Sequence, residues 1–542
     1  MSAGVPYQEA LEHYQPHETL PLEECPLDKQ TLLSRFHPDH IESSRTTLKI
    51  GPNKGDPCHI QLAEQLQSDS RISEADLAGA ATVNTDVLVI GGGGAGCAAA
   101  LIAQQQGAKV ILATKLRLGD SNTIMAEGGI QASINKGDSP QLHYNDTLKA
   151  GHNHSNPNLV EQLVLDGPDT IRWLIQQGMQ FDLDEFGDLL TRRAGGTSAD
   201  RICFYRDYTG LEMMRVLRES VYNSGIEVWN YSPTVELLSD DHGGCSGAVL
   251  SSLKDRKTIQ VNAKSVIVAT GGIGRMHLNT FPTSNHFGAT GDGLVLAYRI
   301  GAKLRDLDSF QYHPTGLAHP YHLAGMLITE GVRSNGSYLL NGLGERFIDE
   351  LQPRDIVAAA IIRECQEGRG IVTEDNQSGV WLDTPGLNLR HPGIIEKRFP
   401  KLMQLGRKAE VNLTEKPMLI YPTLHYQNGG VVINEQCETD IPGLFCVGEV
   451  SGGIHGKNRL MGNALLEIIS YGRRAGAAAA ARRKTKRRSQ LSIEHINQLR
   501  REITIAGLGL DHEGPLLFPE YAKFDLDSDY EGLRHNRKGS HS

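Results

Sequence analysis

The chain has 542 residues, which is too long for a single hydrophobic core and predicts two or three domains. Its formal net charge of -10 argues against a general nucleic-acid binder. The eight cysteines are scattered, without a CxxC pair or a ferredoxin-type spacing, so we expect no iron-sulfur cluster and no other metal site in this chain.

The first 83 residues are polar, contain several prolines and lack a sustained apolar periodicity. The chain does not open with a basic region and an apolar stretch, and no segment has the roughly 20 apolar residues of a membrane span. We therefore expect residues 1–83 to be an N-terminal extension with little core of its own, which serves assembly rather than chemistry. The protein is expected to be cytoplasmic and to reach a membrane only through partner subunits.

Residues 85–115 predict one βαβ unit, with an apolar strand, a glycine turn, an alanine-rich helix and a second apolar strand. Gly91, Gly93 and Gly96 form the GxGxxG pattern of a dinucleotide-binding turn, in which the helix N-terminus faces a pyrophosphate. Thr114 and Lys115 follow the second strand, where an NAD-binding chain would carry an acid. This difference disfavours NAD.

Two later segments, 264–272 and 443–450, are apolar runs that end in glycine and predict further parallel strands. The second run carries Glu449 at its carboxyl end, where the carboxylate could bond the ribityl hydroxyls of FAD. A surface carboxylate is the alternative for Glu449. The glycine turn and the segments 264–272 and 443–450 are far apart in the chain, and a single site built from all three favours FAD over NAD.

We predict an α/β fold in which a Rossmann-like FAD-binding domain is interrupted by an α+β capping domain. The FAD-binding domain takes residues 84–306 and 424–481, and the capping domain takes 307–423. Residues 482–542 form a C-terminal tail that begins with the basic run 482–488. Such a run is most often a solvated helix end and less often a docking patch.

Eight motifs occur in one order between residues 84 and 480. They are GGGGAG (91–96), SNTIMAEGGI (121–130), ATGDG (289–293), QYHPTG (311–316), LITEGVR (327–333), PRD (353–355), HYQNGG (425–430) and VGEVSGGIHGKNRLMGNAL (447–465). Together they resemble the flavoprotein subunit of the succinate dehydrogenase and fumarate reductase family, which also includes L-aspartate oxidase.

The resemblance implies FAD as the cofactor. The residues it assigns to FAD binding are Gly91, Gly93, Gly94, Gly96, Thr114, Lys115, Ser121, Asn122, Thr123, Glu127, Gly128, Gly129, Thr270, Gly271, Asp292, Glu449, Asn463, Ala464 and Leu465. Members with covalent flavin carry a histidine where this chain has Asn122, and an amide cannot attack the flavin 8-methyl carbon. Non-covalent FAD is therefore expected. Asn463 would both begin a helix and, through its amide, face the flavin pyrimidine edge.

The resemblance also assigns a substrate site. His313, Thr329, His425 and Arg459 would bind the two carboxylates of a dicarboxylate, since arginine is the natural bidentate carboxylate partner. Arg354 would deliver a proton to a substrate carbon opposite the hydride from the flavin. Glu330 and Arg333 would return the proton to Arg354. A surface ion pair with Asp355 is the plainer interpretation of Arg354.

The resulting hypothesis is an enzyme that interconverts fumarate and succinate, or a close unsaturated dicarboxylate. Because no cluster is expected in the chain itself, it would exchange electrons with an iron-sulfur or other redox subunit. The alternatives are an L-aspartate oxidase and an FAD subunit that transfers electrons without turnover. Residues after 480 do not match the helical C-terminal domain that the family usually carries, and segment 317–326 is longer than in typical members.

Overall fold

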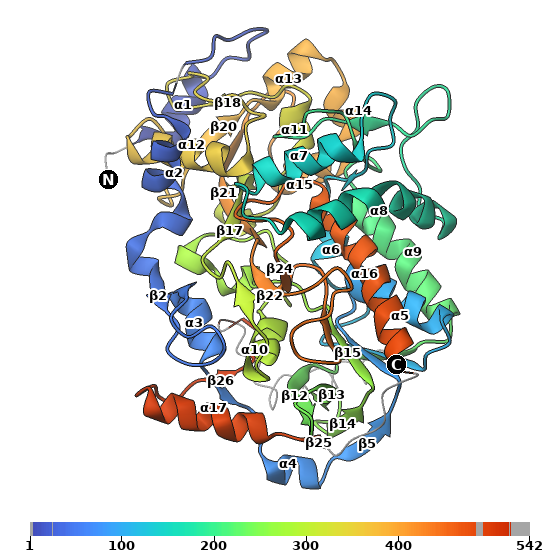
Figure 1. The fold of residues 1–542 in the computed structure, drawn as a ribbon. Coiled ribbons are helices and arrows are strands. Elements are labelled where there is room, and N and C mark those ends of the chain that lie inside the picture. Colours follow the sequence, from blue (N-terminus) through green and yellow to red (C-terminus); the bar gives the residue numbers. More distant parts are fainter. Residues whose placement is uncertain (1–3, 24, 484–490, 520, 522–542) are drawn as a thin grey trace, which may run out of the picture.

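The computed structural model describes residues 4–23, 25–483, 491–519 and 521. The FAD-binding domain contains a five-stranded parallel sheet in the order β11-β7-β6-β15-β23, of which β15 is labelled in Figure 1. The strands are β6 (Val87–Ile90), β7 (Val110–Thr114), β11 (Glu227–Asn230), β15 (Ser265–Val268) and β23 (Leu444–Cys446). Four of them are fully buried, as expected for parallel strands that are covered on both faces. The predicted Rossmann-like α/β domain is confirmed.

Two helices from opposite ends of the domain pack together beside this sheet. They are α5 (Gly94–Gln105), which follows the glycine turn, and α16 (Asn463–Arg482). Gly472 and Gly476 of α16 allow this close approach, because a Cβ on Gly476 would lie 2.3 Å from the carbonyl oxygen of Ala99. The second part of the FAD-binding domain is therefore locked against the first.

The rest of the FAD-binding domain consists of smaller sheets and covering helices. One sheet has the order β25-β12-β13-β14-β5, and two three-stranded sheets have the orders β8-β10-β9 and β16-β22-β24. The bounds are β5 (Ala81–Asn84), β8 (Ile130–Gln131), β9 (Thr191–Arg192), β10 (Ile202–Cys203), β12 (Thr234–Asp240), β13 (Cys245–Ser251), β14 (Thr258–Asn262), β16 (Leu304–Arg305), β22 (Gly430–Val432), β24 (Ser451–Gly452) and β25 (Leu491–Ser492). The helices are α6 (Asn122–Met125), α7 (Pro140–Ala150), α8 (Pro157–Gln176), α9 (Thr209–Asn223) and α10 (Asp292–Arg299).

The capping domain lies at the top of Figure 1 and has its own sheet, in the order β1-β19-β20-β21-β17 with β18 paired to β20. The strands are β1 (Val5–Pro6), β17 (Phe310–Leu317), β18 (Leu339–Leu340), β19 (Ile371–Val372), β20 (Ser378–Leu382) and β21 (Met418–Gln427). The helices are α11 (Gly331–Ser334), α12 (Arg354–Gln366), α13 (Thr384–Arg390), α14 (Ile394–Arg398) and α15 (Pro400–Lys408). Helix α12 packs on this sheet through a separate apolar cluster. Strand β21 crosses the predicted boundary at residues 423–424, and the domain boundaries stay a prediction.

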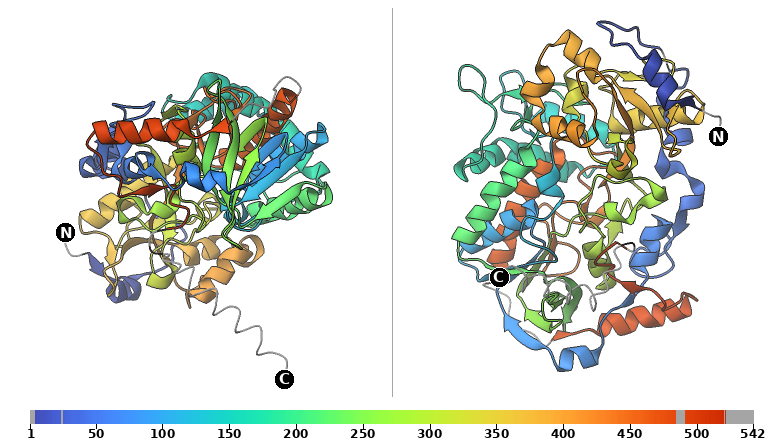
Figure 2. Two further views of the ribbon diagram at one scale, coloured as in Figure 1. Left: turned by 90° about the horizontal axis from the view of Figure 1, so that it is seen from below. Right: turned by 180° about the vertical axis from the view of Figure 1, so that it is seen from behind.

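The N-terminal segment packs against both domains, and its expected role in assembly rather than chemistry stays a prediction. It runs along one side of the molecule from the cap to the base (Figures 1 and 2). Its elements are α1 (Tyr7–His13), α2 (Lys29–Phe36), β2 (Arg45–Thr47), β3 (Pro57–His59), α3 (Ile60–Leu66), β4 (Asp69–Ser70) and α4 (Glu74–Ala78). Leu32 and Phe36 join the apolar cluster of the cap, whereas Leu62 and Leu66 join that of the FAD-binding domain. The segment therefore stabilises both domains.

The described part of the C-terminal tail also packs against the FAD-binding domain. Helix α17 (Glu494–Ile505) lies along the base, and β26 (Glu513–Gly514) pairs with β4 in parallel. Most of the basic run 482–488 lies outside the described residues.

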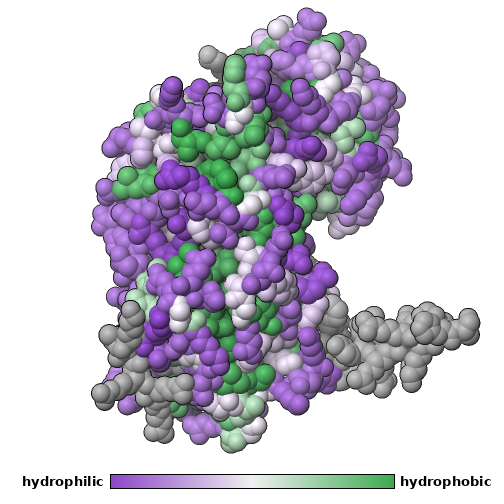
Figure 3. Space-filling view, turned by 90° about the vertical axis from the view of Figure 1, so that its right-hand side faces the viewer, coloured by the Kyte–Doolittle hydropathy of each residue, from purple (hydrophilic) through white to green (hydrophobic). Residues whose placement is uncertain are grey.

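The face that carries α8 and α9 is largely hydrophilic, with hydrophobic side chains showing in patches (Figure 3). Leu165 and Ile175 of α8 and Leu211 and Tyr222 of α9 are exposed. Of the helices in the described ranges, none combines the length and the apolar character that crossing a membrane requires.

Candidate active site

A cavity of about 650 Å³ extends from the glycine turn after β6 to the cap. Most of the predicted site residues line it. They are Gly91, Gly93, Gly94, Thr114, Lys115, Ser121, Asn122, Thr123, Glu127, Gly128, Gly129, Thr270, Gly271, Asp292, His313, Thr329, Glu330, Arg354, His425, Glu449, Arg459, Ala464 and Leu465. The predicted residues that do not line it are Gly96, Arg333 and Asn463.

The glycine turn is packed too closely against neighbouring backbone for side chains at two of its glycines. Gly91 has a φ of 119°, and a Cβ there would lie 2.2 Å from the carbonyl oxygen of Ala269. A Cβ on Gly96 would lie 1.9 Å from the carbonyl oxygen of Gly91, so Gly96 allows the helix to pack on the turn. Gly93 is the N-cap of α5 and has no side chain to cap the amides of the first turn, of which that of Gly94 donates to the hydroxyl of Thr123 at 3.2 Å. These amides and the helix dipole favour an anion at this position.

The polar groups deeper in the cavity suit the hydroxyl groups of FAD. The hydroxyl of Thr270 is buried and has no hydrogen-bond partner among the described residues. The carboxylate of Glu449 is buried, which raises its pKa to about 7. A buried polar atom without a partner costs free energy that a bound ligand can recover. Thr270 and Glu449 therefore fit the cofactor that the glycine turn implies.

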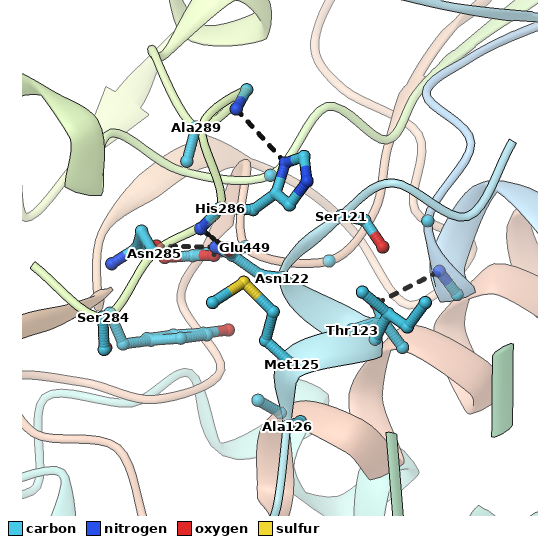
Figure 4. A pocket seen from close by; sticks show the side chains of 18 of the residues that line it. Ser121, Asn122, Thr123, Met125, Ala126, Ser284, Asn285, His286, Ala289 and Glu449 are labelled. Carbon is cyan, nitrogen blue, oxygen red and sulfur yellow. Dashed lines mark hydrogen bonds between the residues drawn. The ribbon is translucent and has the colours of Figure 1, made fainter. Parts of the chain in front are cut away.

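Asn122 joins three segments at the centre of this region (Figure 4). Its Nδ2 donates to Asn285 Oδ1 at 2.6 Å and to Glu449 Oε2 at 3.2 Å, and its Oδ1 accepts from the backbone amide of His286 at 2.6 Å. Asn122 thus positions Glu449, whose Oε1 accepts from the amide of Gln427 at 3.0 Å. Asn285 and His286 line the cavity and were not predicted, because no dinucleotide-binding pattern covers segment 283–288.

At the far end of the cavity Lys115 follows strand β7. Its Nζ lies 2.7 Å from Asp292 Oδ2 and donates to the hydroxyl of Thr290 at 2.8 Å. Two predicted residues, Lys115 and Asp292, therefore meet as an ion pair where other dinucleotide-binding chains place a single acid.

At the cap end, Arg354 begins helix α12 and points into the cavity. Its Nε donates to Glu330 Oε2 at 2.8 Å, and Arg333 Nη2 lies 3.3 Å from the same oxygen. The amide of Gly195 donates to Glu330 Oε1 at 2.8 Å. Burial alone would raise the pKa of Glu330, but the two guanidinium groups outweigh burial and lower it to about 2. Glu330 is thus an ionised carboxylate between two arginines, one of which faces the cavity.

Gln311 links the two arginines that face the cavity and was missed in the sequence. Its Oε1 accepts from Arg354 Nη1 and from Arg459 Nη2, at 3.0 Å each. Its Nε2 donates to Asn458 Oδ1 at 2.8 Å and to the carbonyl oxygen of Arg459 at 2.7 Å. The feature of the sequence that could have identified Gln311 as a site residue is its position at the start of the QYHPTG motif, two residues before His313.

Arg459 is held over the ring of Tyr426, with its guanidinium carbon 4.3 Å from the ring centre. Burial and the nearby charge of Arg354 lower the pKa of Arg459 to about 10, so it stays charged at neutral pH. Its Nε is buried without a hydrogen-bond partner among the described residues. This donor remains available to an anion in the cavity.

His313 and His425 face each other with ring centres 5.1 Å apart. Burial, together with the charge of Arg354, lowers the pKa of each well below its usual value, so both are neutral. His313 Nδ1 accepts from the amide of Thr315 at 3.2 Å, which leaves Nε2 as the proton-bearing nitrogen. The hydroxyl of Thr329 lies in the same wall and accepts from the amide of Gly331 at 3.3 Å.

Two predicted residues have other contacts than expected. Helix α16 begins at Asn463 as predicted, but Gly462 is its N-cap and Asn463 does not cap it. The side chain of Asn463 instead bonds His143 and Thr147 of α7, at 2.8 and 2.9 Å. Glu127 lies 2.8 Å from Lys401 of the cap, an ion pair that joins the two domains.

Comparison with known proteins agrees with this geometry. Residues 86–465 match the family model described as FAD binding domain. The fold and the site define an FAD-dependent oxidoreductase.

The fumarate reductase (CoM/CoB) of Methanothermobacter marburgensis has a subunit that is 39% identical over 406 residues, which cover 73% of this chain and 72% of that protein. L-aspartate oxidase of Streptomyces coelicolor is 37% identical over 414 residues, covering 74% and 69%. A variant of the E. coli quinol fumarate reductase FrdA has a TM-score of 0.71 and 32% identity, covering 78% of this chain and 74% of that chain. The chain therefore belongs to the succinate dehydrogenase and fumarate reductase flavoprotein family.

Proposed function

We propose that this protein interconverts fumarate and succinate, or a close unsaturated dicarboxylate. The observation behind the proposal is that Arg354 and Arg459, which both line the cavity that holds the dinucleotide turn, bond the same oxygen of Gln311 at 3.0 Å each. Both guanidinium groups are buried and bond the same neutral oxygen, so their remaining N–H groups can bind a ligand in the cavity.

The charge of this end of the cavity favours a dianion. Arg354, Arg333 and Arg459 are cationic, whereas Glu330 is the carboxylate bonded between two of them. Neutral imidazoles at His313 and His425 add donors without adding charge. A dicarboxylate would be held by Arg459 and His425 at one carboxylate and by His313 and Thr329 at the other. Arginine suits this task because it binds a carboxylate in bidentate fashion.

FAD, when bound, supplies or accepts the hydride of such a reaction. The residues of the chain would handle the proton. Arg354 would donate it to the substrate carbon. A proton taken up by Arg333 from solvent would then pass to Glu330, 3.3 Å away, and from Glu330 to Arg354 through the 2.8 Å bond. An arginine is a poor acid at rest, because a guanidinium is effectively never deprotonated in proteins. The acceptor here would be a carbanion-like carbon, and Glu330, ionised at rest, shares the charge of the guanidinium until the proton leaves; Glu330 is then protonated only while it passes the next proton to Arg354.

We further propose that the FAD is held without a covalent bond, since Asn122 is occupied by three hydrogen bonds and carries no nucleophile. The electrons would be exchanged with an iron-sulfur or other redox subunit, through which the protein would also reach a membrane. Relatives that are named as subunits of fumarate reductases support this part of the proposal.

Dye-linked turnover of the purified protein tests the function. Fumarate reduction with a reduced dye and succinate oxidation with an oxidised dye should both proceed. L-aspartate serves as the competing substrate, because an L-aspartate oxidase would share the same dicarboxylate groups. Formation of an imino acid from added L-aspartate, with electrons passed to oxygen or to fumarate, would replace the proposal with that alternative.

A further inference from the structure

Residues Glu513–Phe518, here called the C-terminal clasp, are tied to the FAD-binding domain beside the cavity. The clasp begins as β26, which pairs with β4 of the N-terminal segment. Arg299 Nη2 donates to the carbonyl oxygen of Gly514 at 3.1 Å, and Arg71 Nε donates to that of Pro515 at 2.7 Å. The clasp therefore has a defined path toward the cavity wall.

The clasp then bonds to residues that line the cavity or adjoin its lining. The amide of Leu517 donates to Asp292 Oδ1 at 3.3 Å, and the hydroxyl of Thr290 donates to the carbonyl oxygen of Leu517 at 3.2 Å. Leu517 has a φ of 63°, a conformation that bulky L-residues rarely adopt. Next to it, Lys115 Nζ lies 5.7 Å from the centre of the Phe518 ring, within the range of a cation–π contact.

These contacts lie at the adenosine end of the cavity. Lys115 directly follows β7, and in dinucleotide-binding folds the end of this second strand adjoins the adenosine ribose. Lys115 and Asp292 line the cavity and form the 2.7 Å ion pair that the clasp covers. Arg354 and Glu330 line the opposite end, so the clasp is remote from the proposed chemistry.

We propose that the C-terminal clasp is part of the FAD site. It holds Lys115 and Asp292 in the positions that bind the adenosine half of FAD, and Phe518 is the positioning residue that acts through Lys115. The clasp sets how tightly the cofactor is retained, whichever dicarboxylate the other end accepts.

Binding to flavin-free protein separates this role from a general effect on folding. The probes are ADP, which carries only the adenosine and pyrophosphate part, and FMN, which lacks the adenosine. Calorimetry should show that Phe518→Ala weakens ADP about 5-fold, as expected for loss of a partly shielded cation–π contact, and leaves FMN unchanged. Phe186→Ala, at an 83% exposed phenylalanine, is the matched control and should change neither affinity.

Two truncated chains show whether the residues of the clasp, and not those after it, determine the affinity for ADP. A chain that ends at Tyr521 keeps the clasp and should bind ADP like the full chain, whereas a chain that ends at His512 should bind it at least about 10-fold more weakly, because it also loses the bonds to Asp292 and Thr290. Unchanged ADP affinity in Phe518→Ala and in the chain ending at His512 would overturn the proposal. Equal losses for ADP and FMN, or an equal loss in both shortened chains, would overturn it as well.

Discussion

Replacing Arg354 by lysine keeps the positive charge but removes the planar guanidinium group, which bonds Glu330 and faces the cavity. The guanidinium makes a 2.8 Å bond to Glu330 and a 3.0 Å bond to Gln311, and a lysine ammonium at the end of a flexible stem cannot reproduce both and still face the substrate. We expect turnover to fall at least about 100-fold, the usual effect of losing a general acid. That factor corresponds to about 2.7 kcal/mol of transition-state stabilisation.

The variant should remain folded and should bind FAD. Glu330 keeps Arg333 at 3.3 Å and the amide of Gly195, so the loss in unfolding free energy should stay below the roughly 3–5 kcal/mol that follows when a buried ion pair is broken outright. The assays are dye-linked fumarate reduction, flavin absorbance per protein, and thermal unfolding.

Arg363→Lys is the matched control, because Arg363 is a buried arginine on the same helix whose guanidinium bonds Glu364 away from the cavity. It should cost stability but not more than a few-fold in turnover. Near-normal fumarate reduction by the Arg354→Lys protein would refute the proposed proton route. A loss as large in Arg363→Lys would show that the helix, and not the proton donor, was damaged.

Three further predictions concern the cofactor, the substrate site and the domain contact. Acid precipitation should release the yellow flavin into the supernatant, since Asn122 offers no nucleophile; colour in the pellet would contradict this. Gln311→Leu should lower kcat/KM about 10- to 100-fold in steady-state assays, because hydrogen bonds to charged groups contribute about 1.5–3 kcal/mol and two guanidinium groups lose their acceptor; an unchanged kcat/KM would remove Gln311 from the site. His152 of the FAD-binding domain bonds Asp355 of the cap at 2.7 Å, which raises the pKa of His152 above its usual value of 6.5. Its contribution to stability is therefore present below about pH 6.5 and is lost as pH rises through the raised pKa, so chemical denaturation should show that His152→Gln costs up to about 1 kcal/mol at pH 5.5 and less at pH 8.5; an equal cost at both would contradict the ion pair.

The parallel sheet and its glycine turn could be predicted because their signals are local. Val87–Ile90 is a short, continuous apolar run, and Gly91 follows it directly. Adjacent residues therefore determine both the strand and the turn. The clustering of the predicted site residues in one cavity followed from the order of the motifs, which the resemblance supplied.

The contacts of Gln311 could not be predicted, because they depend on residues that are 43 and 148 positions away in the chain. Asn463 shows the same limit. Its position at a helix start is local, but His143 and Thr147 on another helix decide where its side chain points.

The packing of the N-terminal segment on both domains could not be predicted for a related reason. Its helices are short, so their apolar faces give little periodicity within the segment. Phe36 and Leu66 find their partners in two different domains, and only the tertiary structure brings these together. The C-terminal clasp likewise consists of a few residues whose contacts with Lys115 and Asp292 are all long-range.

A single turnover of the bound flavin tests, without any partner subunit, whether the cavity reduces the double bond of a dicarboxylate. The protein is reduced anaerobically and mixed with fumarate or with crotonate, which has the double bond and only one carboxylate. Fumarate should restore the absorbance of oxidised flavin rapidly in the wild type and at least about 100-fold more slowly in Arg354→Lys, while crotonate should have little effect. Flavin that stays reduced with fumarate, or that is reoxidised equally well by crotonate, would contradict the proposed reaction.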